Sequence, residues 1–323
     1  MLIEEELIAG IAAGELEAFA ALDKRGIFCA DHESARDLAE RLQLLNQRTA
    51  EMNRTLADGG AYTIEGITVC QDEQIPPELF QEGHAITAEL FHFQVDWVQG
   101  FFIDPHFSMF FGGGAFCFFP DFFALFIIRR SFRDRQRWLF YQRRELLAHE
   151  LCHVARLSFE ARMFEEICAY QTAFTRFRRY FGGIFQRPRD SFLFLGVTAL
   201  LFASQLCQTF IWPALPGWFF WLLFALTIGW LFLRQKHLMD IFGQARQHLG
   251  WLFPEEHCLA VLCRCSDRDI LDLSQLPDQD AAFTWLQRRC SDTWRWKVNT
   301  LRFCSFAAST TNEAKNTAVP DSQ

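Results

Sequence analysis

Two stretches near residue 200 carry the clearest hydrophobic pattern in the chain. Residues 192–212 and 218–233 contain no charged side chain. At 1.5 Å per residue the first helix is about 30 Å long, the thickness of a bilayer's hydrocarbon layer, and the second reaches about 27 Å if it begins at Pro216. Both stretches are apolar all round, with aromatic residues at their ends. The pattern predicts a transmembrane hairpin and makes the lipid bilayer a partner.

The chain before the hairpin changes between helical and strand-like patterns. Residues 2–57 place Leu and Ala at helical spacing, and residues 61–70 resemble a strand. Between 85 and 133 β-favouring residues dominate, interrupted by turn signals, which predicts a small mixed sheet. Helical spacing returns over 133–157, and a second helix is expected over 160–181, ending at two glycines.

The segment after the hairpin is predicted to be helical as far as residue 306. Ser266 with Asp269 predicts a capping box at one of its helices. The tail is polar without periodicity, which indicates disorder. The expected organisation has five parts: an N-terminal helical region (1–58), a mixed domain (59–190), the hairpin (191–233), a C-terminal helical domain (234–306) and a disordered tail (307–323).

Composition supports the membrane location. Hydrophobic residues make up 50% of the chain and aromatic residues 16%, with Phe at 37 positions, which is high for a water-soluble protein. The net charge of −8 and the lack of a sustained basic stripe argue against nucleic acid as a partner. The 11 cysteines are scattered through apolar segments, which indicates free, buried thiols in a reducing compartment.

Basic residues lie on one side of the predicted hairpin. The turn between the spans holds no Lys or Arg. Such residues precede the first span and follow the second: Arg176, Arg178, Arg179, Arg187, Arg189, Arg234 and Lys236. Cytoplasmic loops carry the excess of Lys and Arg. We therefore expect an integral membrane protein with two spans, with both termini and the mixed domain in the cytoplasm.

The helix expected over 133–157 contains the pattern H-E-x-x-H, as His149, Glu150 and His153. Residues four apart share one face of a helix, so both histidines can bind one metal ion, and Glu150, about 100° further round, can reach a water on that ion. Zinc lowers the pKa of such a water and polarises a carbonyl, while Glu150 takes the proton. The alternative is an exposed helix face that binds nothing.

Zinc needs a third protein ligand. The candidates are Glu160, Glu165 and Glu166. If the first helix continued, Glu160 would lie about 10 Å beyond His153 along the axis, too far to share one ion. Glu165 and Glu166 would point about 100° apart on the next helix, so only one of them can face the metal.

Residues 138–180 resemble the gluzincin zinc metallopeptidases. The residues around the histidines are uncharged, as in that family, and the segment FEEICAYQTAF is similar to its second ligand helix, where the ligand stands in E-x-x-A. Glu166 with Ala169 has this register, so the resemblance implies that Glu166 is the third ligand and Glu165 the runner-up. With the hairpin, the nearest analogy is the membrane-embedded members, such as the heat-shock and prenyl-protein proteases. The implied fold is α+β, with a zincin-like catalytic domain over 59–190.

Many gluzincins have an Asp after this Ala, which orients the first ligand histidine. The present chain has Tyr170 there. Tyr170 lies one turn after Glu166, so it can orient His149 or act as a catalytic donor to a developing oxyanion. The alternative is a tyrosine packed between two helices.

Other candidate sites carry less weight. The segment HCLAVLCRC (257–265) has residue types that bind metals, but its spacing matches no usual zinc framework and fits an apolar helix face. Core or surface roles are expected for the histidines of the strand-rich region, which are His84, His92 and His106. The apolar strands on either side of Pro120 can provide an edge on which an extended peptide pairs.

These features predict a membrane-anchored zinc metallopeptidase that cleaves protein or peptide substrates near the membrane. The alternative is a non-enzymatic membrane protein with partner-binding cytoplasmic domains and a degenerate or structural zinc site.

Overall fold

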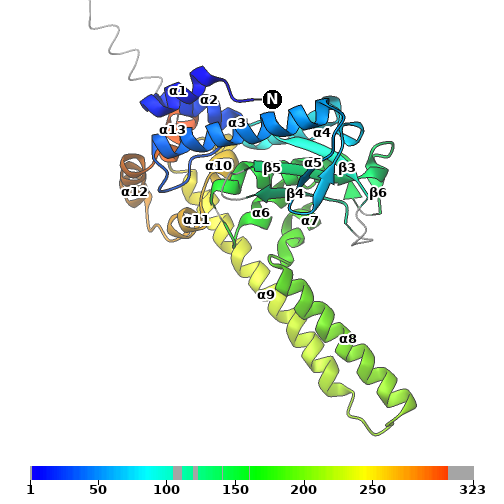
Figure 1. Ribbon diagram of the computed structural model, residues 1–323. Coiled ribbons are helices and arrows are strands. Elements are labelled where there is room, and N and C mark those ends of the chain that lie inside the picture. Colours follow the sequence, from blue (N-terminus) through cyan, green and yellow to red (C-terminus); the bar gives the residue numbers. More distant parts are fainter. Residues whose placement is uncertain (1, 105–110, 119–122, 140, 160, 305–323) are drawn as a thin grey trace, which may run out of the picture.

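The computed structural model describes residues 2–104, 111–118, 123–139, 141–159 and 161–304. The chain forms an α+β body from which two long helices project as a hairpin (Figure 1). This confirms the predicted α+β class. His106, Glu160 and the tail predicted to be disordered lie outside the described residues.

Three helices and a β-hairpin begin the chain. The helices are α1 (Glu5–Ala13), α2 (Leu16–Lys24) and α3 (Ala35–Ala57). Strands β1 (Tyr62–Ile64) and β2 (Ile67–Val69) pair antiparallel. Their two-residue turn has positive φ at both positions, 46° at Glu65 and 84° at Gly66, as a tight hairpin turn requires. The helical and strand-like patterns predicted for this part are confirmed.

The central sheet has three strands in the order β3-β5-β4. They are β3 (Gln99–Ile103), β4 (Gly113–Phe118) and β5 (Phe123–Arg129). Strand β5 lies in the middle, parallel to β3 and antiparallel to β4, and its residues from Phe123 to Ile128 are all buried. Strand β4 is only partly buried. Its outer edge is the one that faces the candidate site described below.

Strands begin later in the sequence than predicted. Residues 85–91 belong to α4 (Pro77–Phe91), not to a strand. Its buried positions include Phe80, His84, Thr87 and Phe91, a helical spacing that outweighs the β-favouring composition. At Gly83 the helix lies so close to α5 (Arg143–Arg156) that an added Cβ would meet the Leu147 Cβ at 2.8 Å. Glycine therefore allows α4 to pack tightly behind the histidine helix.

Both predicted helices of the H-E-x-x-H region are shorter than expected. Residues 137–138 and 141–142 form the short strands β6 and β7 before α5 begins at Arg143. The single helix expected over 160–181 is two helices, α6 (Glu165–Ala169) and α7 (Arg176–Phe181). They are separated because Ala173 is extended and Thr175 caps α7 by accepting a hydrogen bond from the Arg178 N–H. Single 3-10 turns follow or link these elements: η1 (Gln71–Glu73), η2 (Arg130–Phe132), η3 (Leu157–Phe159), η4 (Tyr170–Thr172) and η5 (Gly182–Ile184).

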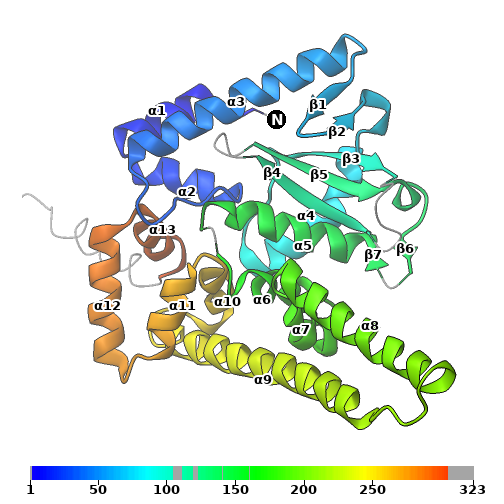
Figure 2. The same ribbon diagram turned by 60° about the horizontal axis from the view of Figure 1, so that its bottom comes forward.

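The hairpin consists of α8 (Pro188–Phe210) and α9 (Trp218–Leu249), seen from another side in Figure 2. Both helices are long and apolar enough to cross a membrane, and 17% of the most apolar stretch of each is buried. This confirms two helices of spanning length. Helix α9 starts at Trp218 instead of Pro216, and its 32 residues run on into the body, where they pack against α10 and α11.

Four helices close the described chain. They are α10 (Glu255–Cys263), α11 (Asp267–Ser274), α12 (Gln279–Asp292) and α13 (Trp294–Phe303). The predicted capping box of Ser266 and Asp269 is present at α11. Thr293 divides α12 from α13. Helix α13 packs on α2, and α10 packs on α4, so one hydrophobic core joins residues from both ends of the chain to the sheet and α5.

Candidate metal centre

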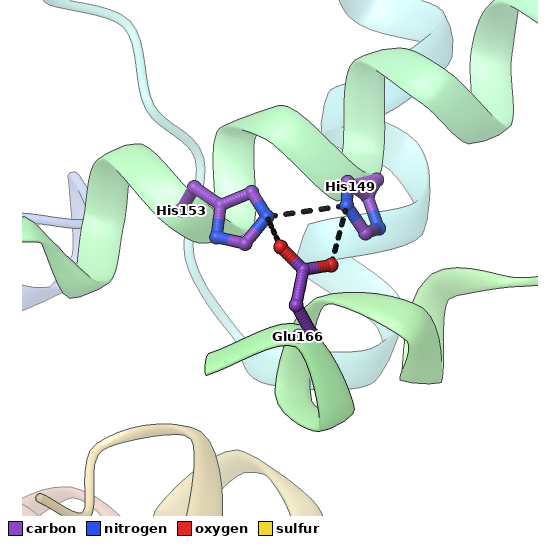
Figure 3. A group of neighbouring side chains, drawn as sticks. All are labelled: His149, His153 and Glu166. Atoms are coloured by element: carbon purple, nitrogen blue, oxygen red, sulfur yellow. Dashed lines mark hydrogen bonds and ion pairs between the residues drawn. The ribbon is translucent and has the colours of Figure 1, made fainter. Parts of the chain in front are cut away.

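Three of the predicted site residues meet between α5 and α6. His149 and His153 extend from α5 towards Glu166 on α6 (Figure 3). The two Nε2 atoms are 3.1 Å apart, and the Glu166 oxygens lie 3.6 Å from His149 Nε2 and 3.5 Å from His153 Nε2. One donor atom from each residue lies within 4.8 Å of the others. The tight turn after α5 brings two segments together here that the sequence separates by twelve residues.

These spacings fit one tetrahedral metal ion. Tetrahedral zinc with bonds of about 2.0–2.1 Å separates neighbouring ligand atoms by about 3.3 Å. The two histidine nitrogens are 3.1 Å apart, and each lies 3.5–3.6 Å from a different oxygen of Glu166. With one donor atom from each residue, all three lie within 4.8 Å of one another. Two imidazole nitrogens and one carboxylate oxygen are also a donor set found in zinc peptidases and other metal sites. The donor atoms can therefore bind an ion without a large change in the backbone.

Glu165 lies behind His153 and not among the converging donors. Its Oε1 is 2.9 Å from His153 Nδ1, and its Oε2 accepts a hydrogen bond of 2.8 Å from Arg156 Nε. A carboxylate on the second nitrogen of a ligand histidine orients the ring and increases its basicity. Burial tends to raise the pKa of Glu165, but Arg156 and His153 outweigh it and lower that pKa. Glu165 therefore remains an anion that orients His153.

The surroundings of His149 determine its protonation, and a hydrogen bond with the backbone of Ala169 is among them. Burial, with the nearby charge of His153, holds the pKa of His149 well below its usual value. His149 is thus neutral, the form in which histidine binds metals.

Glu150 lies beside this group on the same helix. Its Oε2 accepts a 2.9 Å hydrogen bond from the backbone N–H of Ala115, which belongs to the edge strand β4. Its other oxygen has no hydrogen-bond partner in the described ranges. Burial raises the pKa of Glu150 to about 7, against the lowering effects of His153 and the Ala115 N–H. A carboxylate with this pKa can both accept and release a proton near neutral pH.

Tyr170 packs against His149 and does not orient it through a hydrogen bond. The two ring centroids are 4.5 Å apart in an edge-on arrangement. The hydroxyl has no hydrogen-bond partner among the residues that the structure describes. Burial raises the pKa of Tyr170 to about 12, so the hydroxyl keeps its proton. The hydroxyl of Tyr170 can thus donate a hydrogen bond at the edge of the site.

In the absence of a metal the cluster holds a proton. Burial tends to lower the pKa of His153, but Glu165, Glu166 and Glu150 together raise it to about 9. Protonated His153 can donate from Nε2 to the neutral His149 ring 3.1 Å away. Three carboxylates therefore surround a position that attracts positive charge.

The other candidate residues lie elsewhere. His84 is buried, with Nε2 2.9 Å from the Val95 carbonyl oxygen, and His92 packs against His257. In segment 257–265 the three cysteines are buried, as expected for an apolar helix face. Among the described residues, His149, His153 and Glu166 form the only compact group of three or more His, Cys, Asp or Glu side chains.

Two residues of the centre were not anticipated. Arg156 is fully buried and fixes Glu165, and it also donates to the Cys265 carbonyl of the C-terminal region. Ala115 holds Glu150 through its backbone. Arg156 lies three residues after His153, about one turn along the same helix, and this spacing is a signal that the sequence contains. A backbone donor such as Ala115 leaves no such signal.

A cavity of about 460 Å³ adjoins the centre. Glu165 and Glu166 line it together with residues 186–189, which lead into α8. The candidate site therefore opens towards the base of the hairpin.

Comparisons with protein families, curated proteins and solved structures found no match to this chain.

Proposed function

We propose that this chain is a membrane-anchored zinc metallopeptidase of the gluzincin type. It would hydrolyse peptide bonds of protein or peptide substrates near the membrane. The supporting observation is the convergence of His149, His153 and Glu166, whose donor atoms, one from each residue, lie within 4.8 Å of one another, with residue types that bind zinc.

The neighbouring residues support hydrolysis over a purely structural ion. Bound zinc would supply Lewis acidity, which polarises a peptide carbonyl and acidifies a water. Glu150 has one oxygen free and a pKa of about 7, which suits the general base that takes a proton from the attacking water and passes it to the leaving amine. Tyr170, whose hydroxyl keeps its proton and forms no hydrogen bond within the described residues, suits a donor to the developing oxyanion. A structural site has no use for either group.

The position of β4 supports a peptide as the substrate. An edge strand has unpaired backbone groups that can pair with an extended chain. Strand β4 is partly exposed and its Ala115 touches Glu150. An extended peptide paired on β4 would therefore pass beside the general base.

The fold and the flanking charges complete the proposal. A helix with two histidines under an edge strand, followed by a short ligand helix, agrees with a zincin-like catalytic domain. Helices α8 and α9 would cross the bilayer, and the arginines at their body-side ends favour a cytoplasmic location for both termini and the catalytic domain.

The test compares Glu150→Gln with wild type, both as full chains purified in detergent. We expect about one zinc per chain in each, and a loss of about 10²–10⁴-fold in cleavage of labelled casein by the variant. Zinc is measured by elemental mass spectrometry and cleavage by fluorescence. Glu78→Gln, an exposed glutamate on α4, is the matched control and should cleave like wild type.

Three outcomes count against the proposal. If the wild-type protein contains no metal, the proposed zinc site is wrong. If the Glu150→Gln variant cleaves normally, Glu150 is not the general base. Zinc in both proteins with cleavage by neither favours the non-enzymatic alternative with a structural zinc ion.

A further inference from the structure

The body has exposed aromatic side chains where the hairpin leaves it. Phe177 on α7 is 70% exposed and Phe185, just before α8, is 39% exposed. Exposed apolar groups of this size, when they adjoin one another, mark a surface that another apolar phase covers. We call these two residues, with the arginines Arg176, Arg187 and Arg189 between and beside them, the juxtamembrane collar.

Aromatic rings connect the collar to the hairpin. Phe177 packs against Phe181 at 4.9 Å between ring centroids, and Phe181 packs against Phe232 of α9 at 5.4 Å. Phe185 packs against Phe194 of α8 at 5.6 Å. Two chains of aromatic contacts thus connect the exposed rings of the body to the hairpin helices, so the phase that covers the hairpin adjoins these rings as well.

Polar bonds fix the collar to the base of the hairpin. Arg234 of α9 pairs with Asp190 of α8 at 2.9 Å and donates to the Ile184 carbonyl at 2.8 Å. Gln235 donates to the Tyr180 carbonyl at 2.6 Å. These bonds join α7, η5, α8 and α9 at one level (Figures 1 and 2). The collar therefore cannot leave the membrane surface while the hairpin remains inserted.

The collar arginines are available for an external anion. Arg176 and Arg189 are exposed and Arg187 is half-buried, and within the described part of the chain none of the three forms an ion pair. Their neighbours differ, because Arg178 pairs with Glu145 and Arg234 with Asp190. Guanidinium groups bind phosphate oxygens through two parallel hydrogen bonds. Clustered arginines next to a membrane span favour anionic lipids.

We propose that the collar lies in the headgroup layer and binds anionic phospholipids, with Phe177 and Phe185 inserted between acyl chains. The inference rests on the proposed membrane spans. A Cβ added at Gly183, which lies between Phe177 and Phe185 in sequence, would be 3.3 Å from the Glu166 Cβ, so the metal centre touches the segment that joins the two aromatic residues of the collar. Together with the proposed function, this position gives the substrate class: peptide segments that lie within a few residues of the bilayer surface.

The first experiment asks what covers Phe177. The photoreactive residue p-benzoylphenylalanine replaces Phe177, Phe202 or Phe283 in the full chain, reconstituted in vesicles of phosphatidylcholine and phosphatidylglycerol. Phe202 is 64% exposed on α8 and serves as the positive control, and Phe283 is 39% exposed on α12 and serves as the matched negative control. We expect lipid adducts at positions 177 and 202, at least about fivefold above position 283.

Its outcomes separate the collar from the spans and from catalysis. Adducts at 202 without adducts at 177 overturn the collar and leave the spans intact. If neither position 177 nor position 202 forms lipid adducts, both the spans and the membrane contact of the collar are wrong. If position 283 is labelled as strongly as position 177, the membrane contact of the collar is wrong. Because the readout needs neither zinc nor hydrolysis, failure of the proposed peptidase activity does not affect it.

The second experiment tests the arginines. The triple variant Arg176→Gln/Arg187→Gln/Arg189→Gln is compared with Arg36→Gln/Arg268→Gln/Arg288→Gln, whose arginines lie on α3, α11 and α12 and have side chains that are 76–85% exposed. Native mass spectrometry of the detergent-purified chain measures bound phosphatidylglycerol against phosphatidylcholine. We expect the collar variant to lose about tenfold or more of its phosphatidylglycerol affinity and the control to lose none. Equal binding by both variants overturns the headgroup role.

Discussion

Helix α5 carries potential metal ligands on two faces, histidines on one and a cysteine on the other. His149 and His153 point to Glu166. Cys152, between them in sequence, lies about 100° round the helix from His153 and meets Cys263 of α10 with the sulfurs 3.9 Å apart. Both faces are buried, yet burial affects the two ligand types in opposite ways. It lowers the pKa of His149 and so favours the neutral ring that binds metal.

Burial has the reverse effect on the thiol. The contact with Cys263, together with burial, raises the pKa of Cys152 well above its usual value, so the thiolate that a metal needs is disfavoured. The anionic Glu165 lies behind the histidine ligand. Near the thiol, Arg156 tends to lower the pKa of Cys152 but does not outweigh the contact with Cys263 and burial. Similar residue types on one helix therefore differ in metal-binding ability because their surroundings stabilise different protonation states.

Removing one ligand from each face gives the largest expected effect. His153→Ala should lose more than about tenfold of its bound zinc, because three-ligand sites do not retain the ion on two. Cys263→Ala should retain the zinc of the wild type. Elemental analysis of the two purified variants measures the difference. If Cys263→Ala released the zinc and His153→Ala kept it, the assignment of the two faces would be reversed.

The next test asks whether the histidine face is catalytic as well as metal-binding. Tyr170→Phe removes only the hydroxyl, so zinc content should stay constant while hydrolysis falls by about 10²–10³-fold, the usual loss for one oxyanion donor. Casein cleavage at saturating substrate measures it, with Tyr180→Phe on α7 as the control. Unchanged cleavage would assign Tyr170 to packing against His149.

Glu165→Gln sharpens the contrast between the two faces. The amide keeps the shape but loses the charge behind His153, so zinc affinity should fall by about 10–100-fold. Competition with a chromophoric chelator gives the affinity. The exposed Glu255→Gln, whose side chain is 70% accessible, should bind zinc like wild type. A Glu165→Gln variant of normal affinity would show that this carboxylate acts on the fold alone.

The smallest expected effect is a dependence of zinc affinity on pH. His153 has a pKa of about 9 in the metal-free protein, so zinc must displace its proton. The affinity should therefore rise by about tenfold per pH unit from neutral pH and level off near pH 9. Calorimetry in buffers of different ionisation heat should detect release of about one proton at pH 7. A rise that continued well above pH 9 would indicate thiolate ligands instead.

The sequence predicted the positions of the donors better than the elements that carry them. The four-residue spacing of His149 and His153 determines their shared face once a helix is assumed. Glu166 was reached through a family resemblance, because helical geometry alone allowed Glu165 as well. Which of the two glutamates faces the histidines depends on the break before α6, because this break starts the helix at Glu165. Local patterns contain no measure of how sharply a chain turns between two helices.

The predicted helix over 160–181 failed for a related reason. Its apolar spacing continues across Ala173, but the backbone there is extended because Thr175 caps a new helix. The strand region was misplaced because Phe and Val favour strands in general, whereas Thr87 and Phe91 continue the helical spacing of the buried residues of α4. Tertiary packing decided both cases. The hairpin was predictable because its apolar pattern depends on the solvent around it and on no partner within the chain.

The ion pair of Asp190 and Arg234 has a consequence for selectivity. It ties the two hairpin helices at their base, next to the η5 segment that touches Glu166. In a bilayer, the distance between the metal centre and the lipid surface would then be fixed. If the proposed function holds, the chain would select a cleavage position by its distance along the polypeptide from the membrane, and many unrelated sequences could satisfy that requirement.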